Sequence, residues 1–154
     1  LYSYRMRFLD AAVGAALWLN ATKSCTPHAG CRWKMNSTDG APLHFPFLSQ
    51  SLYYGTPGIA LFFARLADAS NEAWRAVATE ALDHTVSHLN ETEAAFGDNP
   101  GFYYGLLGVS YGLRAGAAPS QPIYQQAAAA IERRILASIR PFADPMNANT
   151  TLWN

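Results

Sequence analysis

The sequence of this 154-residue chain predicts an all-α fold, specifically an α/α toroid (a helical-hairpin barrel) of which the chain forms an incomplete arc of about two to three hairpins. Two observations lead to this prediction. A Gly-rich segment that begins at Tyr53 recurs at Tyr103. After each copy, a helical segment that is apolar nearly all round precedes an amphipathic one.

Composition narrows the class of protein. Half of the residues are hydrophobic, 13% are aromatic and 14% are charged, which is typical of a globular domain and not of a disordered chain. Eleven Lys and Arg balance eleven Asp and Glu, so there is no concentrated positive field for binding nucleic acid or a membrane surface. No apolar run approaches the roughly 18–20 residues of a membrane span. We therefore expect no nucleic-acid partner and no transmembrane segment.

The repeat extends well beyond its glycines. Residues 53–59 read YYGTPGI and residues 103–109 read YYGLLGV, and the same offset continues without a gap through the helical segments that follow. Within one domain spanning 1–154, the two repeats cover about 53–90 and 103–140. The matched positions further along the chain are Trp74 with Tyr124, Ala78 with Ala128, Ala81 with Ile131, and Leu89 with Ile139.

Each repeat predicts one inner and one outer helix. Residues 57–69 and 106–117 are apolar almost throughout, so these helices need cover on most sides. Residues 71–89 and 121–139 have one apolar stripe each, as has a preceding helix over 4–19. Extended structure is expected, if anywhere, near 43–47. The predicted inward faces are Met6, Leu9, Val13, Ala16 and Leu17; Trp74, Val77, Ala78, Ala81, Thr85 and Leu89; and Tyr124, Ala127, Ala128, Ile131, Ile135 and Ile139.

The turns before the inner helices carry the glycines. Thr56 is expected as the N-cap of the first inner helix, with Pro57 at its first position. The pattern lacks the Lys-Ser/Thr of a phosphate-binding loop and the strand of a dinucleotide site, so the glycines are interpreted as structural turn residues. They are Gly55, Gly58, Gly105 and Gly108.

A toroid closes when about six or seven hairpins meet end to end. This chain supplies about three at most, starts at Leu1 and stops at Trp153-Asn154. We therefore expect a fragment with apolar surface at both edges, whose partner is the remainder of its own toroid.

The residues 51–62 (SLYYGTPGIALF) and 101–109 (GFYYGLLGV), together with Trp33, resemble the amino-terminal half of lanthionine synthetase C-like proteins, the lanthipeptide cyclases and their relatives. The resemblance covers roughly 8–154 and implies an α/α toroid. It also implies thioether formation on a peptide or thiol substrate: a zinc ion held by two cysteines and a histidine lowers the pKa of a thiol, which adds to a dehydrated Ser or Thr.

The zinc-ligand motifs of the family, W-C-x-G and C-H-G, do not occur in this sequence. Trp153-Asn154 match the opening of the family's next Gly-rich turn, and the chain ends before the acid that follows it. The resemblance therefore implies no catalytic residue here, an inactive fragment, and zinc bound outside it in the full-length protein.

Three other groups of residues are candidate sites. Cys25, His28 and Cys31 could ligate zinc, although free or disulfide-paired loop cysteines fit their spacing better. Glu80, His84 and His88 follow one another at helical spacing and are interpreted as a solvated flank, with a metal or proton-transfer role as the alternative. If the inner-helix starts line one mouth of the toroid, four phenols stand round it and could bind a peptide or sugar, those of Tyr53, Tyr54, Tyr103 and Tyr104.

Two alternatives to a cyclase-like fragment remain open. One is a six-hairpin glycosidase-like toroid, for which Asp39, Glu93 and Asp98 are the loop acids. The other is a non-catalytic helical repeat that binds peptide through its tyrosines. The compartment is also open, because the family implies the cytoplasm whereas four N-x-S/T sequons, at Asn20, Asn36, Asn90 and Asn149, suggest a secreted, glycosylated protein.

Overall fold

A computed structural model describes residues 2–34 and 49–143 of the chain. The described residues form six helices and two short strands, which confirms the predicted all-α class. No helix among them is long and apolar enough to cross a membrane. In chain order the elements are α1 (Tyr2–Thr22), β1 (Ser24–Thr26), β2 (Gly30–Arg32), α2 (Thr56–Ala69), α3 (Trp74–Ser87), α4 (Leu89–Phe96), α5 (Leu106–Gly116) and α6 (Pro122–Ala143).

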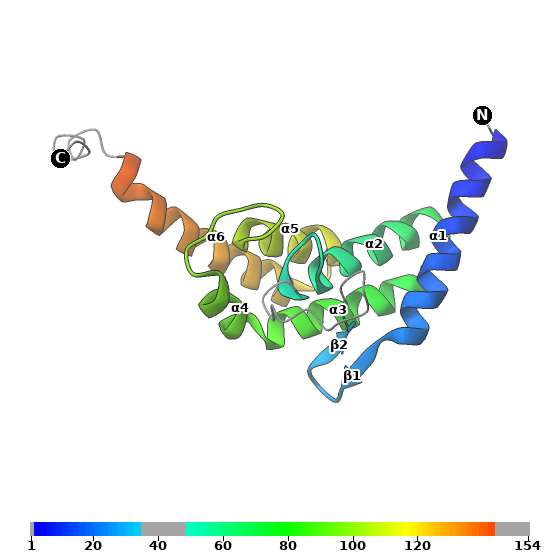
Figure 1. The fold of residues 1–154 in the computed structure, drawn as a ribbon, viewed down its shortest axis with the longest axis horizontal. Coiled ribbons are helices and arrows are strands. Elements are labelled where there is room, and N and C mark those ends of the chain that lie inside the picture. The colour runs from blue at the N-terminus through cyan, green and yellow to red at the C-terminus, as the bar shows by residue number, and fades with distance from the viewer. Residues whose placement is uncertain (1, 35–48, 144–154) are drawn as a thin grey trace, which may run out of the picture.

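The two repeats fold as two helical hairpins that stand side by side (Figure 1). In each hairpin the first helix packs against the second, α2 on α3 and α5 on α6. The first helices also contact each other extensively, whereas α3 has only small contacts with α5 and α6. Helices α2 and α5 therefore form an inner layer, and α3 and α6 cover it from one side.

Burial follows the predicted division between inner and outer helices. Helix α2 buries Phe63 completely, and Phe62 at the preceding position is partly buried beside it. Helix α3 presents one buried stripe from Val77 to Thr85, as its period predicts. The largest side chains with no exposed surface join the two hairpins into one core, and they include Phe63, Leu82, Leu106, Val109, Leu113 and Ile131.

Several boundaries and side chains differ from the predictions. The first outer helix ends at Ser87, because His88 leaves helical geometry (φ −111°, ψ 19°), and α4 follows as a separate helix. Leu17 and Ile139 are exposed instead of inward, because no described element packs over them. Thr56 is already helical and Gly55 is the N-cap. The Thr56 hydroxyl is instead hydrogen-bonded in the interior to Gln50 and Thr85.

A β-hairpin formed by β1 and β2 was not predicted from the sequence. These strands are antiparallel, with Cys25 opposite Cys31. Two residues have positive φ, His28 in the turn and Gly30 at the start of β2. The hairpin packs closely on α3, where a Cβ at Gly30 would collide with the backbone of Glu80 and His84. The expected extended pieces near 43–47 lie outside the described residues.

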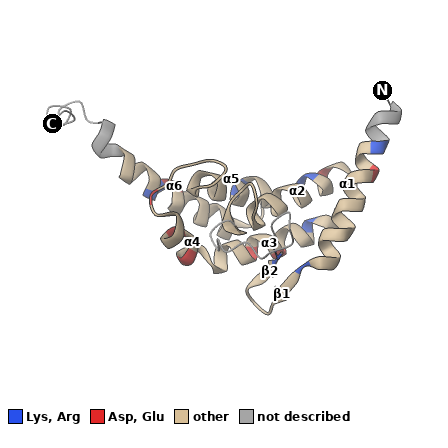
Figure 2. Ribbon diagram, viewed as in Figure 1, with Lys and Arg blue, Asp and Glu red and all other residues tan. Residues whose placement is uncertain are grey.

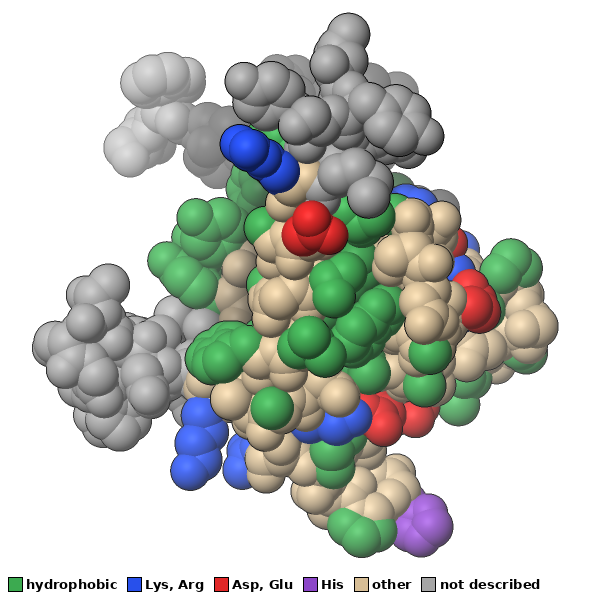
Figure 3. Space-filling model, turned by 90° about the vertical axis from the view of Figure 1, so that its right-hand side faces the viewer, with side chains coloured by type: hydrophobic (Ala, Val, Ile, Leu, Met, Phe, Trp, Pro, Cys, Tyr) green, Lys and Arg blue, Asp and Glu red, His purple; other side chains and the backbone are tan. Residues whose placement is uncertain are grey.

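Helix α1 lies at one end of the molecule and contacts α2 over a small area (Figure 1). The side view of this end shows hydrophobic side chains gathered across the middle of the face (Figure 3). Hydrophobic side chains of α1 and α2 also line an open groove of about 330 Å³, which we call the α1–α2 groove. It is lined by Phe8, Leu9, Ala12, Phe62, Arg65, Leu66 and Ala69.

Charged residues are sparse and of both signs over the described ribbon (Figure 2). Most of the ion pairs are local or join neighbouring helices, such as Arg114 with Glu132 at 2.6 Å. This distribution agrees with the balanced composition and gives no single-sign surface on the described part of the chain.

Candidate functional site

The two Gly-rich turns lie next to each other and are built alike. The backbone N–H of Tyr53 donates to the carbonyl oxygen of Tyr103 at 3.3 Å, which ties one turn to the next. In the first turn of each inner helix, α2 and α5, a glycine lets the backbone of the preceding Gly-rich turn approach closely. A Cβ at Gly58 would lie 2.0 Å from the Leu52 oxygen, and one at Gly108 would lie 1.8 Å from the Phe102 oxygen.

These turns bring the four predicted tyrosines into one cluster, which we call the tyrosine rim. Tyr53 contacts Tyr54, Tyr103 and Tyr104, with ring centroids 4.7, 6.1 and 5.6 Å apart. Tyr53 and Tyr103 are the most exposed, at 60% and 59%. Phe102 and Tyr111, whose ring centroids are 5.3 Å apart, extend the aromatic surface along α5.

The tyrosines of the rim are suited to binding a ligand through the faces of their rings and through their hydroxyl groups. Desolvation, with a hydrogen bond to Tyr54 as the next cause, raises the pKa of Tyr104 above its ordinary value, so this phenol stays protonated at neutral pH. Adjacent aromatic rings with polar tips bind extended apolar and polar groups together, as found in peptides and sugars.

Cys25, His28 and Cys31 do not form a zinc site. Cys25 and Cys31 are joined in a disulfide, so neither sulfur is a thiolate able to bind metal. His28 is an exposed turn residue and does not belong to the group of potential ligand atoms within 4.8 Å, which consists of both cysteines and Glu80. Glu80 forms an ion pair with Lys23.

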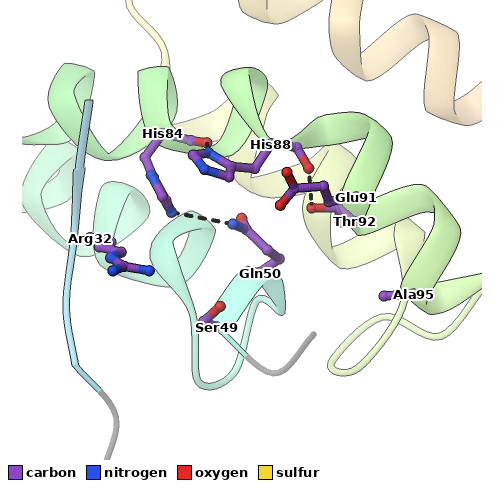
Figure 4. Close-up of a pocket in the computed structure, with 8 residues that line it drawn as sticks. All are labelled: Arg32, Ser49, Gln50, His84, His88, Glu91, Thr92 and Ala95. Atoms are coloured by element: carbon purple, nitrogen blue, oxygen red, sulfur yellow. Dashed lines mark hydrogen bonds between the residues drawn. The ribbon is translucent and has the colours of Figure 1, made fainter. Parts of the chain in front are cut away.

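The predicted solvated flank of Glu80, His84 and His88 is partly exposed at Glu80 and His88, and the prediction is wrong for His84. His84 is only 5% exposed, because the β-hairpin and the segment before α2 cover it. It forms one side of a polar pocket of about 140 Å³, shown in Figure 4, which we call the histidine pocket. The lining residues come from four segments of the chain and are Arg32, Ser49, Gln50, His84, His88, Glu91, Thr92 and Ala95.

Burial determines the protonation state of His84. Desolvation, with smaller contributions from the nearby His88 and Arg32, lowers its pKa to about 4, so the imidazole is neutral near pH 7. Its Nε2 lies 3.4 Å from the Gln50 amide nitrogen (Figure 4). The Gln50 amide oxygen in turn accepts a hydrogen bond from Thr56 at 3.2 Å, which orients the amide nitrogen toward the imidazole.

Glu93 and Asp98, predicted as loop acids of a glycosidase, do not form a catalytic pair, and Glu93 lies within α4 instead of a loop. Glu93 and Asp98 both bind Arg134, at 3.1 and 3.3 Å, and so act together in one ion-pair network. Asp39 lies outside the described residues. Nothing in this arrangement separates an acid from a base as glycoside hydrolysis requires.

Comparison with known protein families gives a match over more than half of the chain. The family model described as "Lanthionine synthetase C-like protein" matches residues 46–138, a span that contains the Gly-rich turns and most of the helical hairpins. No curated protein and no solved structure matches the chain.

Proposed function

Because the chain belongs to the lanthionine synthetase C-like family, we propose that it forms part of the wall of a family-type α/α toroid and that its tyrosine rim binds a peptide segment at one mouth of that toroid. The observation that supports this proposal most directly is the position of the tyrosines: those of two successive repeats meet in one exposed cluster at the starts of the inner helices. The proposed chemistry of the whole protein is the family's thiol addition to dehydroamino acids.

The packing of the helices supports the toroid. Each inner helix contacts its own outer helix and the neighbouring inner helix, so the arrangement can be continued by adding hairpins at either side. The α1–α2 groove is apolar, as is expected for a surface that a further inner helix of the same toroid covers. Phe8, at its edge, is 74% exposed without such cover.

The residues of this chain do not fit the family's zinc. Its ligands are two cysteines and a histidine, and the two cysteines present are bonded to each other on the β-hairpin. We therefore assign no catalytic step to this chain. Its proposed contribution is to position a peptide, through rings that stack on side chains and hydroxyls that donate to backbone carbonyls.

Peptide binding tests the proposal directly. The probe is a fluorescein-labelled ten-residue peptide that contains one cysteine and one dehydroalanine, and the readout is fluorescence anisotropy. We expect saturable binding that Tyr53→Ala and Tyr103→Ala each weaken about three- to tenfold, because each removes one exposed ring of the cluster. Tyr53→Phe keeps the ring and should retain most of the affinity.

Trp18→Ala is the matched control, since Trp18 is an exposed aromatic residue on α1 and not a member of the rim. It should bind like the unchanged chain. Absence of saturable binding, or equal weakening by Tyr53→Ala and Trp18→Ala, would contradict a peptide site at the rim.

The compartment is part of the same proposal. Disulfides persist mainly in oxidising compartments, and the Asn90 sequon lies exposed on α4. Both features favour the secreted, glycosylated alternative over the cytoplasm. The chain secreted from animal cells should therefore lose mass when it is treated with an N-glycosidase. A secreted chain without N-linked glycan would count against the secreted, glycosylated alternative.

A further inference from the structure

We propose that the histidine pocket binds a divalent late transition-metal ion, such as Zn²⁺, through His84 Nε2, His88 Nε2 and the Glu91 carboxylate. His84 lies near the end of α3, His88 at the break between the two helices and Glu91 near the start of α4, and all three line the same cavity (Figure 4). Two imidazoles and one carboxylate with further positions open to water form a known type of metal site.

Both imidazoles are held as metal-binding histidines are. His88 Nδ1 lies 3.0 Å from the backbone oxygen of His84, to which it donates. The backbone of Ala29 accepts a hydrogen bond from the His84 ring, and His84 Nε2 faces Gln50, so Nδ1 is the donor. Backbone carbonyls that fix Nδ1–H leave the Nε2 lone pair for an ion. Contact between the two rings, with centroids 4.1 Å apart, keeps them together.

The third ligand has no competing partner among the residues that the structure describes. Glu91 is exposed at the mouth of the pocket, and no described residue forms an ion pair or hydrogen bond with it. The three ligand atoms do not yet converge within 4.8 Å, so the Glu91 carboxylate must turn toward the two imidazoles to close on an ion. The exposure of the Glu91 side chain allows that rotation.

Two residues that line the pocket, Gln50 and Arg32, weaken the binding of an ion, each by a different effect. Gln50 Nε2 occupies the His84 lone pair at 3.4 Å, a length at the weak end of hydrogen bonding, so little is lost when an ion replaces it. Arg32 lines the pocket with a positive charge that repels a cation. Arg32→Gln should therefore tighten metal binding, which a merely structural pocket would not show.

The site is distinct in its ligands from the zinc of the proposed function, and it can be tested without peptide or activity. Isothermal titration calorimetry of the disulfide-intact chain with zinc sulfate at pH 7.5 should give one site per chain. His88→Ala and Glu91→Gln should each raise the Kd at least about tenfold, because each removes one of three ligands. Electron paramagnetic resonance of the Cu²⁺-loaded chain should show coupling to two imidazole nitrogens.

His28→Ala is the matched control, because His28 is exposed on the β-hairpin beside the disulfide and outside the pocket. It should leave the Kd unchanged. Far-ultraviolet circular dichroism shows whether each variant is folded, and the exposed Glu91 supplies a variant that leaves the core intact. Absence of saturable Zn²⁺ binding, or binding that survives either His88→Ala or Glu91→Gln, would overturn the site, and so would loss of binding in His28→Ala. None of these outcomes bears on peptide binding at the tyrosine rim.

Discussion

Replacement of Gly108 by alanine should destabilise the fold by about 3 kcal/mol or more, although alanine is the better helix former. The added Cβ would lie 1.8 Å from the backbone oxygen of Phe102 and 2.9 Å from Cβ of Leu52. Real Cβ contacts are essentially never below 3.0 Å, so the turn must move away from α5 to admit the new atom. Backbone blocks that atom, so no side-chain rotation relieves the collision.

Gly14→Ala is the matched control, because Gly14 lies within α1 and a Cβ there meets nothing within 4 Å. It should stabilise the chain by roughly 0.5–1 kcal/mol. Urea unfolding followed by circular dichroism at 222 nm measures both variants. A Gly108→Ala chain whose free energy of unfolding differs from that of the unchanged protein by no more than about 0.5 kcal/mol, the ordinary scatter of surface substitutions, would refute the argument that the close approach of the turn requires glycine at the start of α5. Destabilisation of the Gly14→Ala chain to the same extent as Gly108→Ala would refute it as well.

Three further predictions concern pH and the disulfide. Burial lowers the folded-state pKa of His84 to about 4 from an ordinary 6.5. The contribution of the neutral imidazole to stability is therefore full above pH 6.5 and is lost as pH falls toward 4. The midpoint of urea unfolding should fall as the pH is lowered through this range, and a His84→Gln chain should depend less on pH. Hydrogen bonding to Arg114, then to Ser110, lowers the pKa of Glu132 to about 2, so the stability that Glu132 contributes is lost as pH falls from about 4.5 to 2. Glu132→Gln should remove this part of the dependence of the unfolding free energy on acid pH. An unchanged pH profile would contradict a stabilising pair of Glu132 and Arg114. Reduction of Cys25–Cys31 should lower the free energy of unfolding by about 2 kcal/mol, as a short closed loop predicts; equal urea midpoints with and without reductant would show that the hairpin is held by packing alone.

The helical hairpins could be predicted because their signal is local and repeated. A buried stripe at helical spacing appears twice at the same offset, so Val77 and Ala128 could be placed inward from sequence alone. The predictions failed where burial depends on chain that is distant in sequence. Leu17 and Ile139 continue the apolar stripes past the ends of the described packing and stay exposed.

The candidate sites divide in the same way. The tyrosine rim could be predicted because the repeat places the four residues in equivalent turns, and adjacent repeats bring equivalent turns together. The histidine pocket could not, because four separate segments contribute to it and the β-hairpin that buries His84 has only three residues in each strand. The paired cysteines flanking a Pro-His-Ala-Gly turn were the available signal for that hairpin.

The bond from the Tyr53 amide to the Tyr103 carbonyl is made by main-chain atoms alone. Every amino acid except proline can supply that amide, and every amino acid can supply that carbonyl. The spacing of neighbouring turns is therefore set independently of which side chains project from them. A protein built on this plan can exchange tyrosines for other residues to accept a different ligand while the distance between its contact points stays the same.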